Sequence, residues 1–203
     1  MDSVAISIIG VFGLLIGSFL NVVVYRVPAK RSIVSPPSAC PHCGAPIRWA
    51  DNIPVVSWIV LRGKCRDCCA PISARYPLVE LGTGVFFAAV ALWFFLTRLP
   101  DAAWTDLPTT LASALALIAY LYLAAISVAL ALIDLDTHTL PNRIVLPGYV
   151  VGAVLLGGSG LVAGDFAALA TAAIGAAAMF LLYFLLALAY PRGMGMGDVK
   201  LAG

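Results

Sequence analysis

Five long stretches of this sequence contain no charged residue, and their length limits what the chain can fold into. A helix needs about 20 apolar residues to cross the roughly 30 Å hydrocarbon core of a bilayer. Continuous apolar runs satisfy their backbone in lipid as helices, whereas the strands of a membrane barrel alternate apolar and polar residues. We therefore predict an all-α polytopic membrane protein, a helical bundle with spans at residues 4–25, 81–97, 107–133, 144–164 and 166–191.

Composition agrees with residence in a membrane. The chain is 62% hydrophobic and 11% charged, whereas soluble globular domains are about half apolar and a quarter charged. The first run follows Met1-Asp2-Ser3 with no basic residue before it, so we expect the first helix to stay in the mature protein rather than to be cleaved as a signal peptide. A new apolar run begins near Gly203, so we expect further C-terminal spans.

Basic residues are concentrated between the first two spans, which sets the orientation. Cytoplasmic loops carry the excess of Lys and Arg, so we place this segment in the cytoplasm and the N-terminus outside. We divide the chain into a first span (1–25), a cytoplasmic loop domain (26–78) and a membrane core (79–203). The sequence contains no basic stripe interleaved with aromatic residues, so we expect no nucleic-acid partner. Eight of the twelve basic residues lie in the loop: Arg26, Lys30, Arg31, Arg48, Arg62, Lys64, Arg66 and Arg75.

All five cysteines lie in this loop, four of them in two Cys-x-x-Cys pairs. Cys40 and Cys43 form the first pair, and Cys65 and Cys68 form the second, 21 residues later. Two such pairs offer four thiolates to a tetrahedral zinc ion. A reducing cytoplasm disfavours the alternative of two disulfides, and four unliganded thiols are the other alternative. We predict a structural zinc-ribbon-like site, because four protein ligands leave no position for a catalytic water.

Two further loop residues stand beside these ligands. Cys69 is a spare thiol or an alternate ligand, and His42 is a solvated loop residue. We assign neither to the metal.

Two aspartates at span ends are the candidate catalytic residues. Asp134 closes the third span and Asp198 follows the fifth, so both lie at the cytoplasmic face. A pair of carboxyl groups can supply both acid and base when one is ionised and the other protonated. Each residue alone also fits an ordinary interfacial aspartate, and Asp198 fits an ordinary helix N-cap.

Asp136 competes with Asp134 for the first role. Positions two apart on a helix point about 200° away from each other, so the two cannot face the same partner. We choose Asp134, because it lies nearer the apolar run and is expected to be the more desolvated. His138 is interpreted as a solvated turn residue, and the glycines at 193, 195 and 197 as a flexible bend before Asp198 rather than a phosphate loop.

These motifs together resemble the bacterial type IV prepilin peptidases, the leader peptidase/N-methyltransferases among membrane aspartic proteases of the Gly-x-Gly-Asp class. The resemblance covers nearly the whole chain. It is carried by Gly17-Ser18-Phe19-Leu20-Asn21, Tyr25-Arg26 and Pro28, the four-cysteine loop, Asp51-Asn52-Ile53-Pro54 with Ser57-Trp58, Arg62-Gly63-Lys64-Cys65, Pro71-Ile72-Ser73, Arg75-Tyr76-Pro77-Leu78-Val79-Glu80, Ile133-Asp134-Leu135-Asp136 with Pro141-Asn142, and Gly195-Met196-Gly197-Asp198-Val199-Lys200.

The resemblance implies that Asp134 and Asp198 are the catalytic pair of a multi-pass enzyme of the bacterial inner membrane. It implies prepilins and pseudopilins of type IV pili or type II secretion as substrates, cut after a Gly at the end of a short basic leader. It also implies N-methylation of the new terminus with S-adenosylmethionine. Family members usually have about three more spans.

Three points stay open. The sequence contains no glycine motif of the dinucleotide-binding type, so it does not indicate where S-adenosylmethionine would bind. Glu80 is the residue to test for methyl transfer, although it also fits a carboxylate that reaches back to water or pairs with Arg75. A proton-coupled transporter and a membrane scaffold are the alternative functions, disfavoured because the acids gather at one face and no internal repeat of spans is visible.

Overall fold

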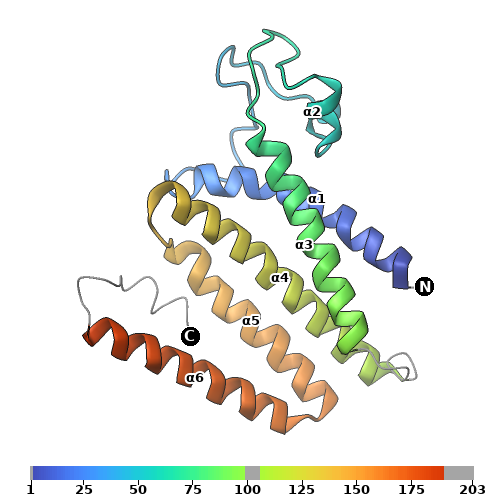
Figure 1. Ribbon diagram of the computed structural model, residues 1–203, viewed down its shortest axis with the longest axis vertical. Helices are drawn as coiled ribbons and strands as arrows, with labels where there is room; N and C mark the ends of the chain where they lie inside the picture. The colour runs from blue at the N-terminus through green and yellow to red at the C-terminus, as the bar shows by residue number, and fades with distance from the viewer. Residues whose placement is uncertain (1, 99–105, 190–203) are drawn as a thin grey trace.

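The computed structural model describes residues 2–98 and 106–189 and folds them into a bundle of long helices (Figure 1). Five helices are long and apolar enough to cross a membrane, which confirms the all-α fold with five spans. The described residues contain no β-strand, only isolated bridges between Ala39 and Pro46 and between Lys64 and Pro71. The helices are α1 (Asp2–Arg26), α3 (Arg75–Thr97), α4 (Leu107–Thr137), α5 (Asn142–Ala163) and α6 (Phe166–Ala189), with the short helices η1 (Trp49–Asn52) and α2 (Val56–Val60) in the loop after α1.

The ends of α4 follow from local capping. The Asp106 carboxylate accepts a hydrogen bond from the Thr109 backbone N–H at 3.2 Å, which satisfies one free amide of the first turn. At the other end His138 takes a left-handed conformation and donates its N–H to the Asp134 carbonyl at 2.8 Å. The helix therefore continues past residue 133, and both Asp134 and Asp136 lie in its last turns.

Glycines let α1 and α3 pack in close contact. A Cβ on Gly13 would lie 2.7 Å from the Phe87 Cβ and 2.9 Å from the Gly84 Cα, and a Cβ on Gly17 would lie 2.7 Å from the Glu80 Cα. Residues further toward the start of α1 meet residues further toward the end of α3, so the two helices are antiparallel. Small residues commonly form such interfaces, because in lipid the association of helices depends on close packing.

The other helices add to this pair in chain order. Leu20 and Val23 of α1 form a buried cluster with Ala129 of α4. The Ser159 hydroxyl of α5 donates to the Ala112 carbonyl of α4 at 2.8 Å. Figure 1 shows α4, α5 and α6 running side by side, α1 crossing α3, and the loop between α1 and α3 at one end of the bundle. We call this end the loop side.

Substitution of Gly17 by Val is expected to destabilise the protein by about 1–3 kcal/mol, the usual range for overpacking. The added side chain would meet the backbone of α3, which cannot move away without separating the two helices. Thermal unfolding in detergent micelles measures the change.

Gly82→Ala is the matched control, because a Cβ at Gly82 has no atom within 4 Å. Equal stability of the Gly17 variant and this control would show that the α1–α3 contact is looser than described.

Candidate functional site

The four predicted metal ligands come together in the loop. The Sγ atoms of Cys40, Cys43, Cys65 and Cys68 all lie within 4.8 Å of one another and could hold a metal ion. The Cys40 and Cys68 sulfurs are 3.8 Å apart. Thiolates at such mutual distances suit one tetrahedral four-sulfur centre.

The two halves of this cluster are built alike. Each has a Cys-x-x-Cys turn closed by a backbone hydrogen bond, from Cys40 N–H to the Ala45 carbonyl at 2.9 Å and from Cys65 N–H to the Ala70 carbonyl at 2.8 Å. Gly44 and Cys69 each follow the second cysteine of their turn, and both have positive φ, 72° and 58°. Cys69 thus occupies the position that ends the turn.

We did not predict this duplication from the sequence, although a short repeat in the sequence indicates it. Ala-Pro-Ile follows each turn, at residues 45–47 and again at 70–72. The repeat gives Cys69 the structural place of Gly44, which the spacing of the cysteines alone does not reveal.

The backbone around the first turn favours a thiolate. The pKa of Cys40 is lowered to about 6, chiefly because the backbone N–H of Cys43, and next that of His42, hydrogen-bonds to the sulfur. The pKa of Cys68 is raised to about 12, because desolvation and the neighbouring thiols outweigh the hydrogen bond from the Ala70 N–H. Four thiols crowded in this way resist full ionisation unless a cation lies between them.

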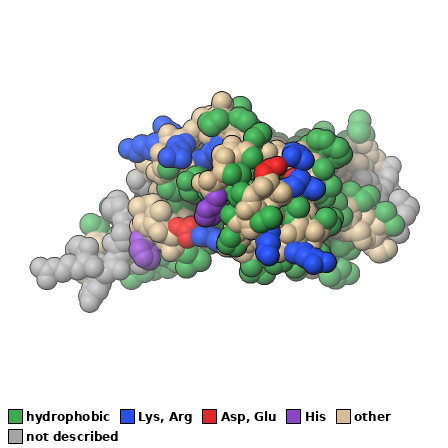
Figure 2. All heavy atoms as spheres, turned by 90° about the horizontal axis from the view of Figure 1, so that it is seen from above, with side chains coloured by type: hydrophobic (Ala, Val, Ile, Leu, Met, Phe, Trp, Pro, Cys, Tyr) green, Lys and Arg blue, Asp and Glu red, His purple; other side chains and the backbone are tan. Residues whose placement is uncertain are grey.

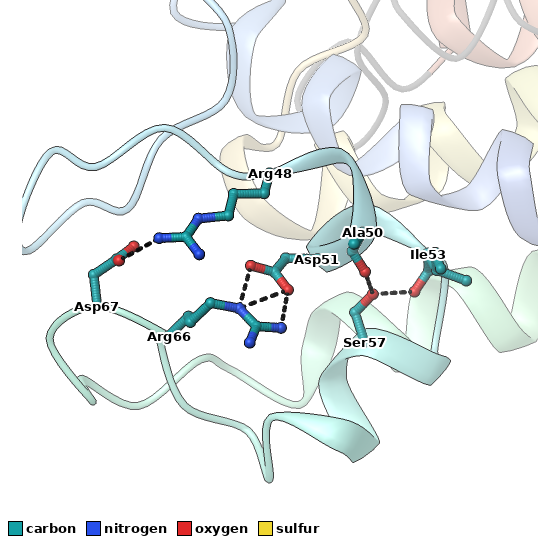
Figure 3. Close-up of polar contacts among 7 residues, drawn as sticks. All are labelled: Arg48, Ala50, Asp51, Ile53, Ser57, Arg66 and Asp67. Atoms are coloured by element: carbon teal, nitrogen blue, oxygen red, sulfur yellow. Dashed lines mark hydrogen bonds and ion pairs between the residues drawn. The ribbon is translucent and has the colours of Figure 1, made fainter.

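Ion pairs fasten the two halves of the loop to each other (Figure 3). The Arg66 Nε donates to both carboxylate oxygens of Asp51, at 3.0 and 2.8 Å, and Arg48 pairs with Asp67 at 3.0 Å. The Asp51 side chain is only 10% exposed, whereas that of Asp67 is 39% exposed. The pKa of Asp51 is lowered, first because Arg66 hydrogen-bonds to its carboxylate.

Glu80 connects the loop to the bundle. Its Oε2 accepts the backbone N–H of Val55 at 2.7 Å. Val55 has φ 63° and ψ −50°. This conformation costs a β-branched residue about 1–3 kcal/mol and persists only where the surrounding structure enforces it. Neither alternative that the sequence left for Glu80 is observed: the side chain is buried rather than turned to water, and Arg75 pairs elsewhere.

Arg75 is the partner of Asp136. Its Nη1 and Nη2 donate to the two carboxylate oxygens at 2.8 and 2.6 Å, which joins the start of α3 to the end of α4. The sequence did not reveal this pair, because its members are 61 residues apart.

Asp134 has a different environment. It is exposed at the same helix end, and its carboxylate has no partner among the described residues. Burial within the protein does not distinguish the two aspartates, because both are exposed. Asp136 is instead distinguished by its bond to Arg75. Asp198 and the glycines at 193, 195 and 197 lie outside the described residues.

Comparisons with known proteins give a consistent result. The model of the bacterial peptidase A24 N-terminal domain matches residues 11–94, and that of the type IV leader peptidase family matches residues 121–203. No solved structure matches.

Several curated proteins named "prepilin leader peptidase/N-methyltransferase" are similar to the chain. One from Aeromonas hydrophila is 38% identical over 96% of this chain and 70% of its own length, and one from Neisseria gonorrhoeae is 38% identical over 97% and 71%. One from Myxococcus xanthus is 46% identical over 71% of this chain and 38% of its own length.

The two ion pairs of the loop are expected to differ in importance. Replacing Arg66 by Ala removes three hydrogen bonds from a nearly buried carboxylate, whereas Arg48→Ala removes one from an exposed carboxylate. We expect amide hydrogen exchange at residues 49–53 to accelerate more in the Arg66 variant, because an unpaired buried charge is costly. Equal exchange in the two variants would contradict this ranking.

Proposed function

Because the chain belongs to the type IV leader peptidase family, we propose that it is an intramembrane aspartic endopeptidase that removes the basic leader of type IV prepilins and pseudopilins. Cleavage would follow a Gly at the cytoplasmic membrane face, with N-methylation of the new terminus as a second step. The activity would serve pilus biogenesis or type II secretion. The matches of both family models and the names of the similar proteins support this proposal.

The chain is a multi-pass protein of the inner membrane, and we propose that the loop side is cytoplasmic. Seen from the loop side, separate groups of Lys and Arg side chains stand among larger hydrophobic areas (Figure 2). Excess basic charge is typical of cytoplasmic loops. The N-terminus would then lie outside, with the chain divided into a first span (1–25), a loop domain (26–78) and a protease core (79–203).

We assign the peptidase chemistry to Asp134 and Asp198. The observation that carries Asp134 is its unpartnered carboxylate at the loop-side end of α4, where Asp136 is already bound by Arg75. Asp198 is assigned from its Gly-x-Gly-Asp motif.

In the proposed mechanism one carboxylate is ionised and takes a proton from the attacking water. The other is protonated and donates its proton to the oxygen of the scissile carbonyl. The roles then exchange, and a proton passes to the departing amine. The apolar helix of a prepilin would lie in the bilayer beside the bundle, which places its leader junction at the depth of the helix ends.

We propose zinc as the metal of the cysteine cluster, with a structural role. Zn–S bonds of about 2.3 Å at tetrahedral angles separate neighbouring sulfurs by about 3.8 Å, and Cys40 and Cys68 lie 3.8 Å apart. Four thiolates would complete the coordination, so the ion would hold the two turns together and take no part in the reaction.

S-adenosylmethionine would supply the methyl group, but the described cavities do not fit it. Small-molecule sites usually enclose about 300–1,000 Å³ and combine apolar walls with a few convergent polar groups. The cavity between α3 and α4 measures about 480 Å³ and is almost wholly apolar, and the one beside Asn52 measures about 220 Å³. We assign no residue to methyl transfer.

Asp134→Asn is expected to reduce cleavage at least about 100-fold, the lower end of what acid–base catalysis contributes. Asp198→Asn should do the same. Membranes containing the full-length protein would be mixed with a prepilin, and leader removal would be followed by the shift in mass.

Asp136→Asn is the control, expected to retain cleavage because the Asn side chain keeps an oxygen that can accept a hydrogen bond from Arg75. Leader removal by the Asp134 or Asp198 variant at the wild-type rate would rule out the mechanism.

Cys40→Ser is expected to lower bound zinc from about one ion per chain to a small fraction, because three thiolates bind this metal far more weakly than four. Elemental analysis of the purified protein measures the loss. Cys69→Ser is the matched control, because Cys69 lies outside the four-sulfur cluster. Unchanged metal in the Cys40 variant, or equal loss in both, would refute the assignment.

A further inference from the structure

One part of the loop lies beside the membrane-spanning part of α1 rather than beyond its end. Asn52 and Pro54 line a cavity of about 220 Å³ whose other walls include Ser18, Phe19 and Val22 of α1. Phe19 precedes Arg26, the last residue of α1, by seven positions, which is about 10 Å along a helix axis. The segment therefore lies alongside the last turns of α1 and not beyond Arg26.

A contact with α3 also places the segment beside a membrane-spanning helix. Val55 donates its N–H to Glu80 at 2.7 Å, and Glu80 lies five positions, or about 7.5 Å of helix, inside α3 from Arg75. Gly17 on α1 lies against the Glu80 backbone. Contacts with two membrane-spanning helices therefore place residues 52–55 beside apolar side chains of both α1 and α3.

The backbone of this segment is satisfied internally, as a lipid environment requires. The Ser57 hydroxyl hydrogen-bonds to the carbonyls of Ala50 at 3.1 Å and Ile53 at 2.8 Å (Figure 3). Val56 N–H reaches the Pro54 carbonyl at 2.6 Å, and Pro54 has no N–H to satisfy. Non-helical backbone is tolerated at membrane depth only when its polar groups have such partners.

The outer face of the segment is apolar. Val56, Ile59 and Val60 share one face of α2 and are 52%, 61% and 69% exposed. Ile53 and Trp49 are exposed beside them. A soluble loop rarely exposes so many large apolar residues together.

This face adjoins exposed apolar side chains of a helix that is long and apolar enough to cross a membrane. Leu15 and Phe19 line the cavity beside Asn52, belong to a membrane-spanning helix, and are about half exposed. Exposed Arg48 and Arg62 stand at the two ends of the segment, where they can meet anionic headgroups. Tryptophan at such a boundary is typical of residues that sit at headgroup level.

We propose that residues 49–60 form an interfacial membrane anchor. The apolar face of α2 docks into the boundary between headgroups and acyl chains of the loop-side leaflet, with Trp49 at headgroup level. Glu80 positions the anchor by accepting the Val55 N–H, so a carboxylate buried in the bundle holds the loop against both helix and lipid. The ligand is the lipid surface itself, and the anchor does not depend on the peptidase activity.

Photolabelling of the full-length protein in phosphatidylglycerol vesicles tests the proposal. The probes are a phospholipid with a diazirine in its acyl chain and, in parallel, a water-soluble diazirine. Trypsin releases residues 49–62 as one peptide, because no Lys or Arg lies between Arg48 and Arg62. We expect this peptide to carry the lipid probe. Labelling by the water-soluble probe alone, or cross-linking to a second copy of the chain, would overturn the proposal.

Variants separate the anchor from general folding. Val56→Asp with Ile59→Asp should abolish lipid labelling of the peptide, whereas Val34→Asp, at an apolar residue that is 84% exposed in the same loop, should leave it unchanged. Glu80→Gln keeps an acceptor for Val55 and should preserve labelling, whereas Glu80→Leu should lose it while bound metal is retained. Persistent labelling in the double Asp variant would overturn the anchor, and persistent labelling in Glu80→Leu would overturn the role of Glu80.

Discussion

The bilayer core offers no water to a peptide group, and this constraint governs the whole molecule. Every N–H and C=O at membrane depth must find a partner within the protein, so the chain crosses as continuous helices of 22 residues or more. The same constraint explains the capped ends of α4 and the internally bonded turn before α2. It also explains why a carboxylate as costly to bury as Glu80 is retained in a helix interior, since it satisfies a backbone group that would otherwise have none.

The loop is not an independent appendage of the bundle. Glu80 holds it at Val55, and Arg75, where the loop ends, holds the last turn of α4 through Asp136. Two members of the cysteine cluster, Cys65 and Cys68, lie between these attachments along the chain, whereas Cys40 and Cys43 precede Val55. In a prepilin peptidase these contacts connect the loop to the helix end that carries Asp134. Disorder in the loop would therefore change the position of the candidate catalytic carboxylate.

The sequence predicted those features of the structure that short segments of the chain determine. Span positions follow from runs of apolar residues, and the cysteine cluster follows from two short motifs. The pairing of Glu80 with Val55 and of Arg75 with Asp136 joins residues 25 and 61 positions apart, and no periodicity or spacing marks such contacts. Asp134 was chosen because it was expected to be more desolvated than Asp136, and burial within the protein does not distinguish the two, because both are exposed near the end of α4. Asp198 remains a prediction from sequence.

The glycines of α1 show that insertion of a helix into the bilayer and its assembly with a second helix depend on different features of the sequence. Hydropathy is enough for insertion, and many apolar sequences would meet that need. Assembly with α3 depends instead on side chains that are missing at Gly13 and Gly17. A leucine-rich helix of the same length would enter the bilayer yet find no partner surface there. The sequence of the first span is therefore suited to packing against α3 as well as to entering the bilayer.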